Sequence, residues 1–515
     1  MLFVSYQFIF FLFLVFLLFY CVPGKFQTAV LLLASYCFYW YAGEGCLLYI
    51  LITTVSTFLI ANKISGLKSA IGLEKKKKKA KQKHWLILCL CINIGLLCFF
   101  KYTNFTIYNI NNLIQFANGT RPFTYMELIL PLGISFYTFQ SVGYVVDVYR
   151  GKYTAEKNIL RLALFVSFFP QVIQGPISRY DALSQSLFSE KKFDKTVICS
   201  GLQRILWGYF KKLVVADRIL LAVNEIIRNP EQYQGTYVLL GALFYAVELY
   251  ADFTGGIDIT IGIGELFGVH IAENFRRPFF SKSVKEYWTR WHISMGTWFR
   301  DYVFYPVSVC GPMKRMTSFF KKHGGKSIGK KVPVYLASFI VWFLTGLWHG
   351  ASWNFIVWGL GNFFLIMISE ECKPLFSKIH ERFPKMKQKA WFAVFQIFRT
   401  ILLMSCLRMF DCYKTIPETI RMFSSIFTKW NGRILFDGSL LNIGLDMADY
   451  VILLAGVVLM FMVSFLQRKG SVRMQIKTLP TVCRFGIWYA LFLTVVLFGA
   501  YGMGYDAAQF IYNQF

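Results

Sequence analysis

Long uninterrupted runs of apolar residues set the strongest limit on how this chain can fold. The plainest runs occupy residues 1–22, 28–42, 47–61, 85–100, 391–407, 450–466 and 484–500. About 17–25 apolar residues are enough for a helix to cross the hydrocarbon core of a bilayer. Hydrophobic residues make up 56% of the 515-residue chain, above the ~45–50% of an ordinary soluble domain. The sequence therefore predicts an all-α, polytopic membrane protein with roughly 11–12 transmembrane or re-entrant helices.

No break in composition separates a soluble domain from these runs. We expect a single integral-membrane domain over residues 1–515, with N-terminal spans at 1–125, a core at 126–370 and C-terminal spans at 371–515. The first apolar run lacks a basic n-region and a small-residue cleavage site. We therefore expect it to be a retained span rather than a signal peptide.

The core differs from both ends because Pro, Gly and charged residues interrupt its helical pattern. The interruptions lie in PLGISFYTFQSVGYVVDVYRG (131–151), FFPQVIQGPISR (168–179) and YADFTGGIDITIGIG (250–264). Irregular backbone survives at membrane depth only where protein or a water-filled cavity satisfies its polar groups. We therefore expect broken helices and a cavity in this part of the chain.

The formal net charge is +28, which in a soluble protein would indicate a nucleic-acid ligand. Here the basic residues gather between apolar runs, in segments such as 74–84 and 321–331. Basic loops are retained on the cytoplasmic side, where they pair with anionic lipid headgroups. We therefore expect membrane lipid and no nucleic acid as a partner, and a multi-pass protein of the cytoplasmic (inner) membrane. A cytoplasmic loop at 74–84 then places the N-terminus outside and residues 101–124 on the exterior.

Two familiar kinds of site are missing from the pattern. The twelve cysteines include no CxxC pair, so we expect neither a metal site nor a disulfide framework. The glycine-rich stretch GGIDITIGIG (255–264) lacks the strand–GxGxxG–helix frame and the GK[ST] ending of a phosphate-binding loop.

Two histidines stand in apolar, aromatic-rich segments. His349 lies in FLTGLWHGASWN, and His292 lies in SVKEYWTRWHISMGTWF, which we predict to be one helix from Ser283 onward, capped by Ser281 or Ser283. Ionisable groups inside spans are costly and face a partner or an aqueous path. Histidine can accept and return a proton near neutral pH. Each ring is either a buried structural hydrogen-bonder or a functional group, and the residues alone leave both interpretations open.

Three carboxylates also lie in or beside an apolar run, namely Glu248, Asp252 and Asp258. One interpretation is structural, with these groups pairing with arginines such as Arg300 or holding broken backbone. The alternative is a proton relay or an ion site.

Six sequence blocks follow one another in a fixed order. They are PLGISFYTFQSVGYVVDVYRG, FFPQVIQGPISR, YADFTGGIDITIG, NFRRPFFSKSVKEYWTRWHISMGTWFRDYVFYP, GLWHGASWNFIVWG and the terminal FIYNQF. With these blocks, over residues 131–370 and the extreme C-terminus, the chain resembles the membrane-bound O-acyltransferases (MBOAT). The likeness is to the bacterial subgroup of the alginate O-acetylation membrane protein and the teichoic-acid D-alanyl transfer protein. Gly256 and Ile257 depart from the Tyr-Ser pair common there, and Asn513 departs from the common ending FIYFQF.

The resemblance implies a helical fold around a membrane-crossing tunnel with a cytoplasmic funnel, and acyl transfer to a hydroxyl. The near-invariant histidine of the family falls on His349, and its second important polar position falls on His292. We assign His349 as general base toward the acceptor hydroxyl, and His292 as the group that positions a substrate or stabilises the oxyanion. The further residues expected to line the path or brace it are Trp348, Trp291, Trp298, Asp252, Asn354, Ser352 and Arg300.

For the substrates, the resemblance implies a cytoplasmic thioester donor, either acetyl-CoA or the phosphopantetheine of an acyl carrier protein, and no bound cofactor. The acceptor is expected outside the cytoplasm, as a cell-surface or exported polysaccharide or a partner protein that relays the acyl group. Acetyl transfer is the favoured form. D-alanyl transfer from a carrier protein toward teichoic acid is the second enzymatic interpretation, and a proton-coupled transporter or exporter is the alternative from another class.

Overall fold

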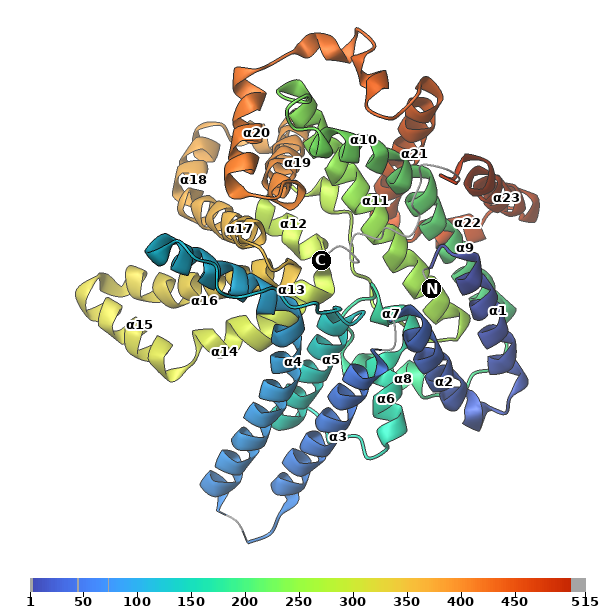
Figure 1. Ribbon diagram of the computed structural model, residues 1–515. Coiled ribbons are helices and arrows are strands. Elements are labelled where there is room, and N and C mark those ends of the chain that lie inside the picture. Colours follow the sequence, from blue (N-terminus) through green and yellow to red (C-terminus); the bar gives the residue numbers. More distant parts are fainter. Residues whose placement is uncertain (1–2, 44–45, 73, 502–515) are drawn as a thin grey trace. The chain divides into compact units, whose positions relative to one another are not determined.

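The computed structural model describes residues 3–43, 46–72 and 74–501, and every regular element in these ranges is a helix (Figure 1). The all-α prediction is therefore confirmed. The terminal block FIYNQF, with Asn513, lies outside the described residues.

Eight of the described helices are long and apolar enough to cross a membrane. They are α3 (Leu47–Ser69), α4 (Lys75–Asn118), α11 (Thr236–Leu266), α16 (Gly325–His349), α17 (Trp353–Glu371), α19 (Ala390–Cys412), α21 (Met447–Leu466) and α23 (Thr481–Phe498). Their outward faces carry large exposed apolar side chains, such as Phe398 and Phe485, which water would penalise and lipid accepts. The chain is thus a multi-pass membrane protein, and shorter or broken helices account for its other apolar stretches.

The described chain divides into two compact units. The first holds the residues up to Ile205 together with Ile257–Ala272, and the second holds Leu206–Gly256 and the chain from Glu273 onward. The helices α9 (Lys195–Tyr209) and α11 each run from one unit into the other. The expected division into spans, core and spans at residues 125 and 370 stays a prediction.

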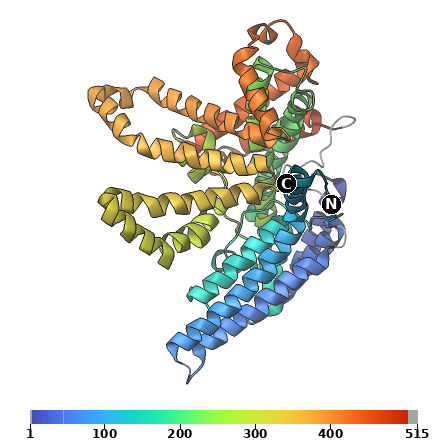
Figure 2. The ribbon, with the colours of Figure 1, turned by 60° about the vertical axis from the view of Figure 1, so that its left-hand side comes forward.

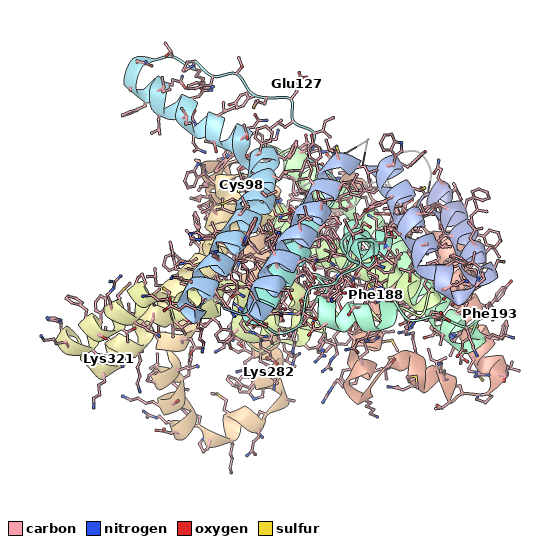
Figure 3. The ribbon with its side chains drawn as sticks, turned by 90° about the horizontal axis from the view of Figure 1, so that it is seen from below. Cys98, Glu127, Phe188, Phe193, Lys282 and Lys321 are labelled. Carbon is pink, nitrogen blue, oxygen red and sulfur yellow. The ribbon has the colours of Figure 1, made fainter. Side chains whose placement is uncertain are left out.

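In the first unit, α3 and α4 pack side by side with α5 (Ile134–Arg150), and α2 (Gly24–Ala42) packs on α6 (Ile159–Ser167) (Figure 1). Figure 3 marks Cys98 along α4 and Glu127 on the extended segment that follows this helix. That segment returns along the end of α4, because the Asn104 side chain makes two hydrogen bonds with the backbone of Met126.

The sequence predicted a loop for the lysine-rich stretch 74–84, but this prediction is wrong. Lys75 begins helix α4, with Glu74 at its N-cap. Lysine is a good helix former. Helix α4 therefore continues through this run, beyond its apolar part, and the lysine side chains are mostly exposed. Which side of the membrane the lysines face stays a prediction.

The expected breaks in the core are confirmed in one place and wrong in another. Within FFPQVIQGPISR, the chain passes from the one-turn helix α7 (Phe169–Val172) through irregular backbone to α8 (Tyr180–Leu187). The stretch 250–264, by contrast, lies inside the unbroken helix α11. Its glycines serve close helix packing instead, because a Cβ on Gly255 would lie 3.0 Å from the carbonyl oxygen of Gly208 in α9.

The second unit contains two consecutive helical hairpins, visible in Figure 2. Helix α15 (Gly311–His323) doubles back on α16, and α16 doubles back on α17. The basic segment 321–331, expected as a loop, forms the end of α15 and the start of α16. Figure 3 marks Lys321 near the tip of this hairpin. Helix α17 also packs on α19.

Candidate active site

His349 is the last residue of α16, at the turn into α17. The two helices cross closely because glycines face backbone at the crossing. A Cβ on Gly346 would lie 2.4 Å from the carbonyl oxygen of Phe355, and one on Gly359 would lie 2.4 Å from that of Trp342. This close approach sets the indole of Trp358 against the imidazole of His349, with ring centroids 4.6 Å apart and planes at 71°. His349 is 6% exposed, so it lies inside the protein and not at a lipid-facing surface.

His292 stands at a break that the sequence did not reveal. The predicted single helix is in fact two, α12 (Val284–Arg290) and α13 (Ile293–Phe299), with Ser283 as the N-cap of α12 as expected. His292 has φ 46° and ψ 55°, in the left-handed region that is strained for a residue with a Cβ. Such outliers persist where the surroundings hold them, and they gather at functional sites.

Asn274 holds this break in place. Its Oδ1 accepts a hydrogen bond of 2.9 Å from the backbone N–H of Ser294, and its backbone carbonyl accepts one of 3.0 Å from the backbone N–H of Ile293. Since a backbone N–H can only donate, the amide orientation is fixed, and Nδ2 of Asn274 faces Nδ1 of His292 at 3.3 Å. The amide therefore donates to Nδ1. In the neutral ring the proton is on Nε2, which makes His292 a hydrogen-bond donor at that atom.

Burial and charge reinforce this assignment. His292 is fully buried and lies outside the eight candidate spans. Its burial, and after that the positive charge of Arg408, lower the pKa of His292 from the ordinary 6.5 to about 3. The ring is therefore neutral near pH 7. A neutral donor suits an oxyanion better than it suits proton abstraction.

The two histidines belong to one chain of aromatic contacts. Phe253 of α11 packs edge-on against His292, with centroids 5.0 Å apart. On the other side, Trp348 lies 5.8 Å from His292 and 5.0 Å from His349. A single indole thus contacts both imidazoles, and each imidazole packs against a further aromatic ring, Phe253 for His292 and Trp358 for His349.

Arg408 of α19, which the sequence analysis missed, lies behind this chain. Its guanidinium carbon is 4.6 Å from the ring centroid of Trp358, 5.7 Å from that of Trp291 and 5.9 Å from that of Trp288. Asp411 accepts a hydrogen bond of 2.7 Å from Arg408. The signal was present in the sequence, since SCLRMFDC places an arginine and an aspartate one turn apart inside an apolar run.

Of the predicted site residues, His349, His292, Trp348 and Trp291 are brought together. Trp291 stacks on Tyr287, with centroids 5.4 Å apart, and shares the Arg408 contact. Trp298 is buried in α13 beside Tyr302.

The other predicted residues have structural partners. Asn354 donates a 2.6 Å hydrogen bond to the carbonyl of Tyr413, and Ser352 stands at the N-cap position of α17 without a capping hydrogen bond from its side chain to the described backbone. The side chain of Arg300 is 54% exposed and pairs with Asp301.

Asp252 and Asp258 pair with cations other than Arg300. Asp252 lies 2.7 Å from Lys212, and Asp258 lies 2.8 Å from Arg204. The carboxylate of Asp252 is thus part of an ion cluster. The next residue, Phe253, is the one that packs against His292. Across the described residues, no group of three or more His, Cys, Asp or Glu side chains could hold a metal ion.

The buried histidine pair thus lies in a polytopic helical membrane protein. Comparison with known proteins identifies the family. Residues 155–410, about half of the chain, match the family described as MBOAT, membrane-bound O-acyltransferase. This stretch contains His292, His349 and Arg408. The chain belongs to this family.

The particular relatives are bacterial proteins. A probable alginate O-acetylase of Pseudomonas putida is 34% identical over 364 residues, which cover 70% of this chain and 68% of that protein. The one of Pseudomonas syringae pv. tomato is 35% identical over 363 residues, 70% of this chain and 64% of its own length. A teichoic acid D-alanyltransferase of Bacillus subtilis is 29% identical over 279 residues, 53% of this chain and 66% of that protein. The match therefore spans just under two thirds of the Pseudomonas syringae relative.

Proposed function

We propose that this protein transfers an acyl group, acetyl in the first instance, from a cytoplasmic thioester to a hydroxyl of a cell-surface or exported polysaccharide. The observation that carries the proposal is the pair of buried imidazoles, His292 and His349, joined through the single indole of Trp348. Relatives named alginate O-acetylase support acetyl as the group transferred.

The reaction assigns one task to each histidine. His349 takes the proton of the acceptor hydroxyl as its oxygen attacks the thioester carbonyl carbon. His292, a neutral donor at Nε2, stabilises the oxyanion that forms on the carbonyl oxygen. The C–S bond then breaks, and His349 returns the proton to the departing sulfur. The ester and the thiol are the products, and His349 regains its starting state.

The surrounding aromatic rings protect this chemistry from water. A thioester that meets water instead of the acceptor is hydrolysed, so a transferase must exclude water from the reacting atoms. Phe253, Trp348 and Trp358 present apolar surface to the imidazoles, and all three are buried. A tunnel that brings the two substrates to these rings from opposite faces of the membrane is part of the proposal.

The basic hairpin of α15 and α16 is the proposed approach for the donor. Its basic residues include Lys314, Arg315, Lys321, Lys322, Lys326, Lys330 and Lys331. No acidic residue occurs in the sequence from Tyr302 to Ser369. A cationic surface of this kind raises the local concentration of anions. It would attract the phosphates of acetyl-CoA or of a carrier-bound phosphopantetheine, and anionic lipid headgroups as well.

The test is a mass analysis of the ester groups on the cell-surface polysaccharide, with and without this gene. Loss of O-acetyl groups in cells that lack the gene is expected. Loss of D-alanyl esters would identify the reaction named for the Bacillus subtilis relative. An unchanged ester content, together with solute flux that depends on the proton gradient, would contradict the proposal and support a transporter.

A further inference from the structure

Arg408 is a buried cation, paired with one carboxylate of its own helix. Its side chain is about 6% exposed, and Asp411, one helical turn away, is its ion-pair partner at 2.7 Å. Burying a guanidinium is costly unless its charge and its donors are satisfied. Among the described residues, no hydrogen-bond partner reaches the Nε of Arg408. Stability alone gives little reason for an arginine at this position, because a well-packed apolar pair is often at least as stable as a buried ion pair.

What Arg408 does have is aromatic surface from two other helices. Trp358 comes from α17, whereas Trp288 and Trp291 come from α12 and its end, and all three rings lie within 6 Å of the guanidinium carbon. A planar guanidinium over an indole gains both cation–π attraction and stacking area. The arginine thus joins α12, α17 and α19 at one point.

Two of those rings also belong to the aromatic contacts around the two histidines. Trp358 packs on His349 at 4.6 Å, and Trp291 packs on Phe253 at 6.3 Å, which in turn contacts His292. Trp288 adds a brace, since its Nε1 donates a 2.9 Å hydrogen bond to Asn362. A guanidinium that fixes the indoles therefore also fixes the walls against which both imidazoles pack.

We propose that Arg408, oriented by Asp411, is a positioning residue of the acyl transfer, which holds Trp358 and Trp291 and through them the two imidazoles. This inference rests on the function proposed above. A base must lie within hydrogen-bond reach of the proton it takes, and small misplacements of reacting groups are costly in rate. Arg408 itself stays behind the tryptophans and touches no reacting atom.

The planar shape of the cation is the property that the structure uses. Lysine would keep the charge but not the flat face, and its compact ammonium could approach one indole at a time. If the planar shape is needed, Arg408→Lys should have a lower kcat than wild type. A purely electrostatic role would leave kcat unchanged.

A second buried arginine provides a matched control. Arg218 of α10 (Asp217–Arg228) is also buried, pairs with Asp449 and donates a 2.7 Å hydrogen bond to the carbonyl of Phe498. It lies in the same unit and has these partners in place of the tryptophans. Arg218→Lys therefore measures the general cost of changing a buried arginine.

The experiment uses the full chain, purified and reconstituted in vesicles, with acetyl-CoA as donor and the polysaccharide as acceptor. For each variant, kcat and KM are measured and divided by the amount of protein that elutes as a folded monodisperse species. Arg408→Lys is expected to lower kcat at least ~10-fold with a KM within about 2-fold of wild type, because misplaced groups lose transition-state contacts. Arg218→Lys is expected to keep the wild-type kcat per folded molecule.

Asp411→Asn provides a second test of the role of Arg408 if Arg408→Lys does not fold. The amide retains an acceptor of the same shape but no charge, so the guanidinium stays and is held less firmly, and a smaller loss of kcat is expected. Wild-type kcat in both variants would overturn the inference, and so would an equal loss in Arg218→Lys. Absence of transfer by the wild-type protein would instead overturn the proposed function, and the inference with it.

Discussion

Two buried cations of the second unit are held in opposite ways. Lys212 lies 2.7 Å from Asp217 and 2.7 Å from Asp252, and all three side chains are almost completely inaccessible. Arg408 has Asp411 and the faces of three indoles. A compact ammonium is matched by point charges, whereas a planar guanidinium is spread over aromatic surface that continues to the histidines. The comparison teaches that a buried charge alone does not identify a site, and that the groups it contacts do.

The largest expected effect comes from His349, which packs on Trp358, one of the indoles in contact with Arg408. His349→Ala removes the proposed base, and general base catalysis contributes about 10²–10⁴-fold to rate. We expect the O-acetyl content of the polysaccharide to fall to the level of cells without the gene. Immunodetection of the variant in the membrane fraction is the control. Substantial acetylation by a variant present at wild-type levels would disprove the base assignment.

His292 tests whether the second imidazole acts as a donor. His292→Ala is expected to lower kcat severely, by about 10²–10³-fold, which is the cost of losing one oxyanion donor. His292→Gln retains an N–H group and should keep more activity than His292→Ala in the same transfer assay. Equal activity in the two variants would show that no donor acts from this position.

Lys212 should produce the opposite result. Lys212→Met leaves two buried carboxylates without their shared cation, and breaking a buried ion pair costs about 3–5 kcal/mol of stability. We expect a large drop in the thermal unfolding midpoint in detergent, with near-normal transfer per folded molecule. A normal unfolding midpoint with lost transfer would mean that the Lys212 cluster takes part in the reaction, so Lys212 and Arg408 would not differ in this respect.

The smallest effect concerns acid stability. Because His292 has a pKa of about 3 in the folded protein and 6.5 ordinarily, the unfolded chain binds a proton in this window that the folded chain does not. Its contribution to stability is therefore present above pH 6.5 and is lost as the pH falls toward 3. Unfolding midpoints of wild type and His292→Gln, measured from pH 7 to pH 4, should show the steeper decline in wild type. Parallel curves would mean that the ring is not held neutral.

Sequence reasoning succeeded where one helix decides the outcome. Runs of membrane length predicted α1 (Tyr6–Cys21), α19 and α23 within a few residues, since burial in lipid depends on composition and length. The histidines stood out because ionisable groups are rare in such runs. The helix predictions and the choice of the histidines both rest on local properties of the chain, and the role of the histidines stays a prediction.

Apart from the basic segments 74–84 and 321–331, which form helix ends, the failures depend on neighbours distant in sequence. The break before His292 has no Pro or Gly to announce it, and Asn274, 18 residues earlier in the chain, holds it. The glycines of α11 read as helix breakers, but Gly255 faces the backbone of α9. Arg408 could be seen as an ion in a span, but its contacts with three tryptophans depend on how α12, α17 and α19 pack.

The central claim is that catalysis depends on the imidazole of His349 and not merely on a folded core. The most direct test is the acetyl-transfer rate per folded molecule of reconstituted His349→Ala beside that of Lys212→Met. We predict loss of transfer with a wild-type unfolding midpoint for His349→Ala, and the reverse for Lys212→Met. Wild-type transfer by folded His349→Ala would contradict the account.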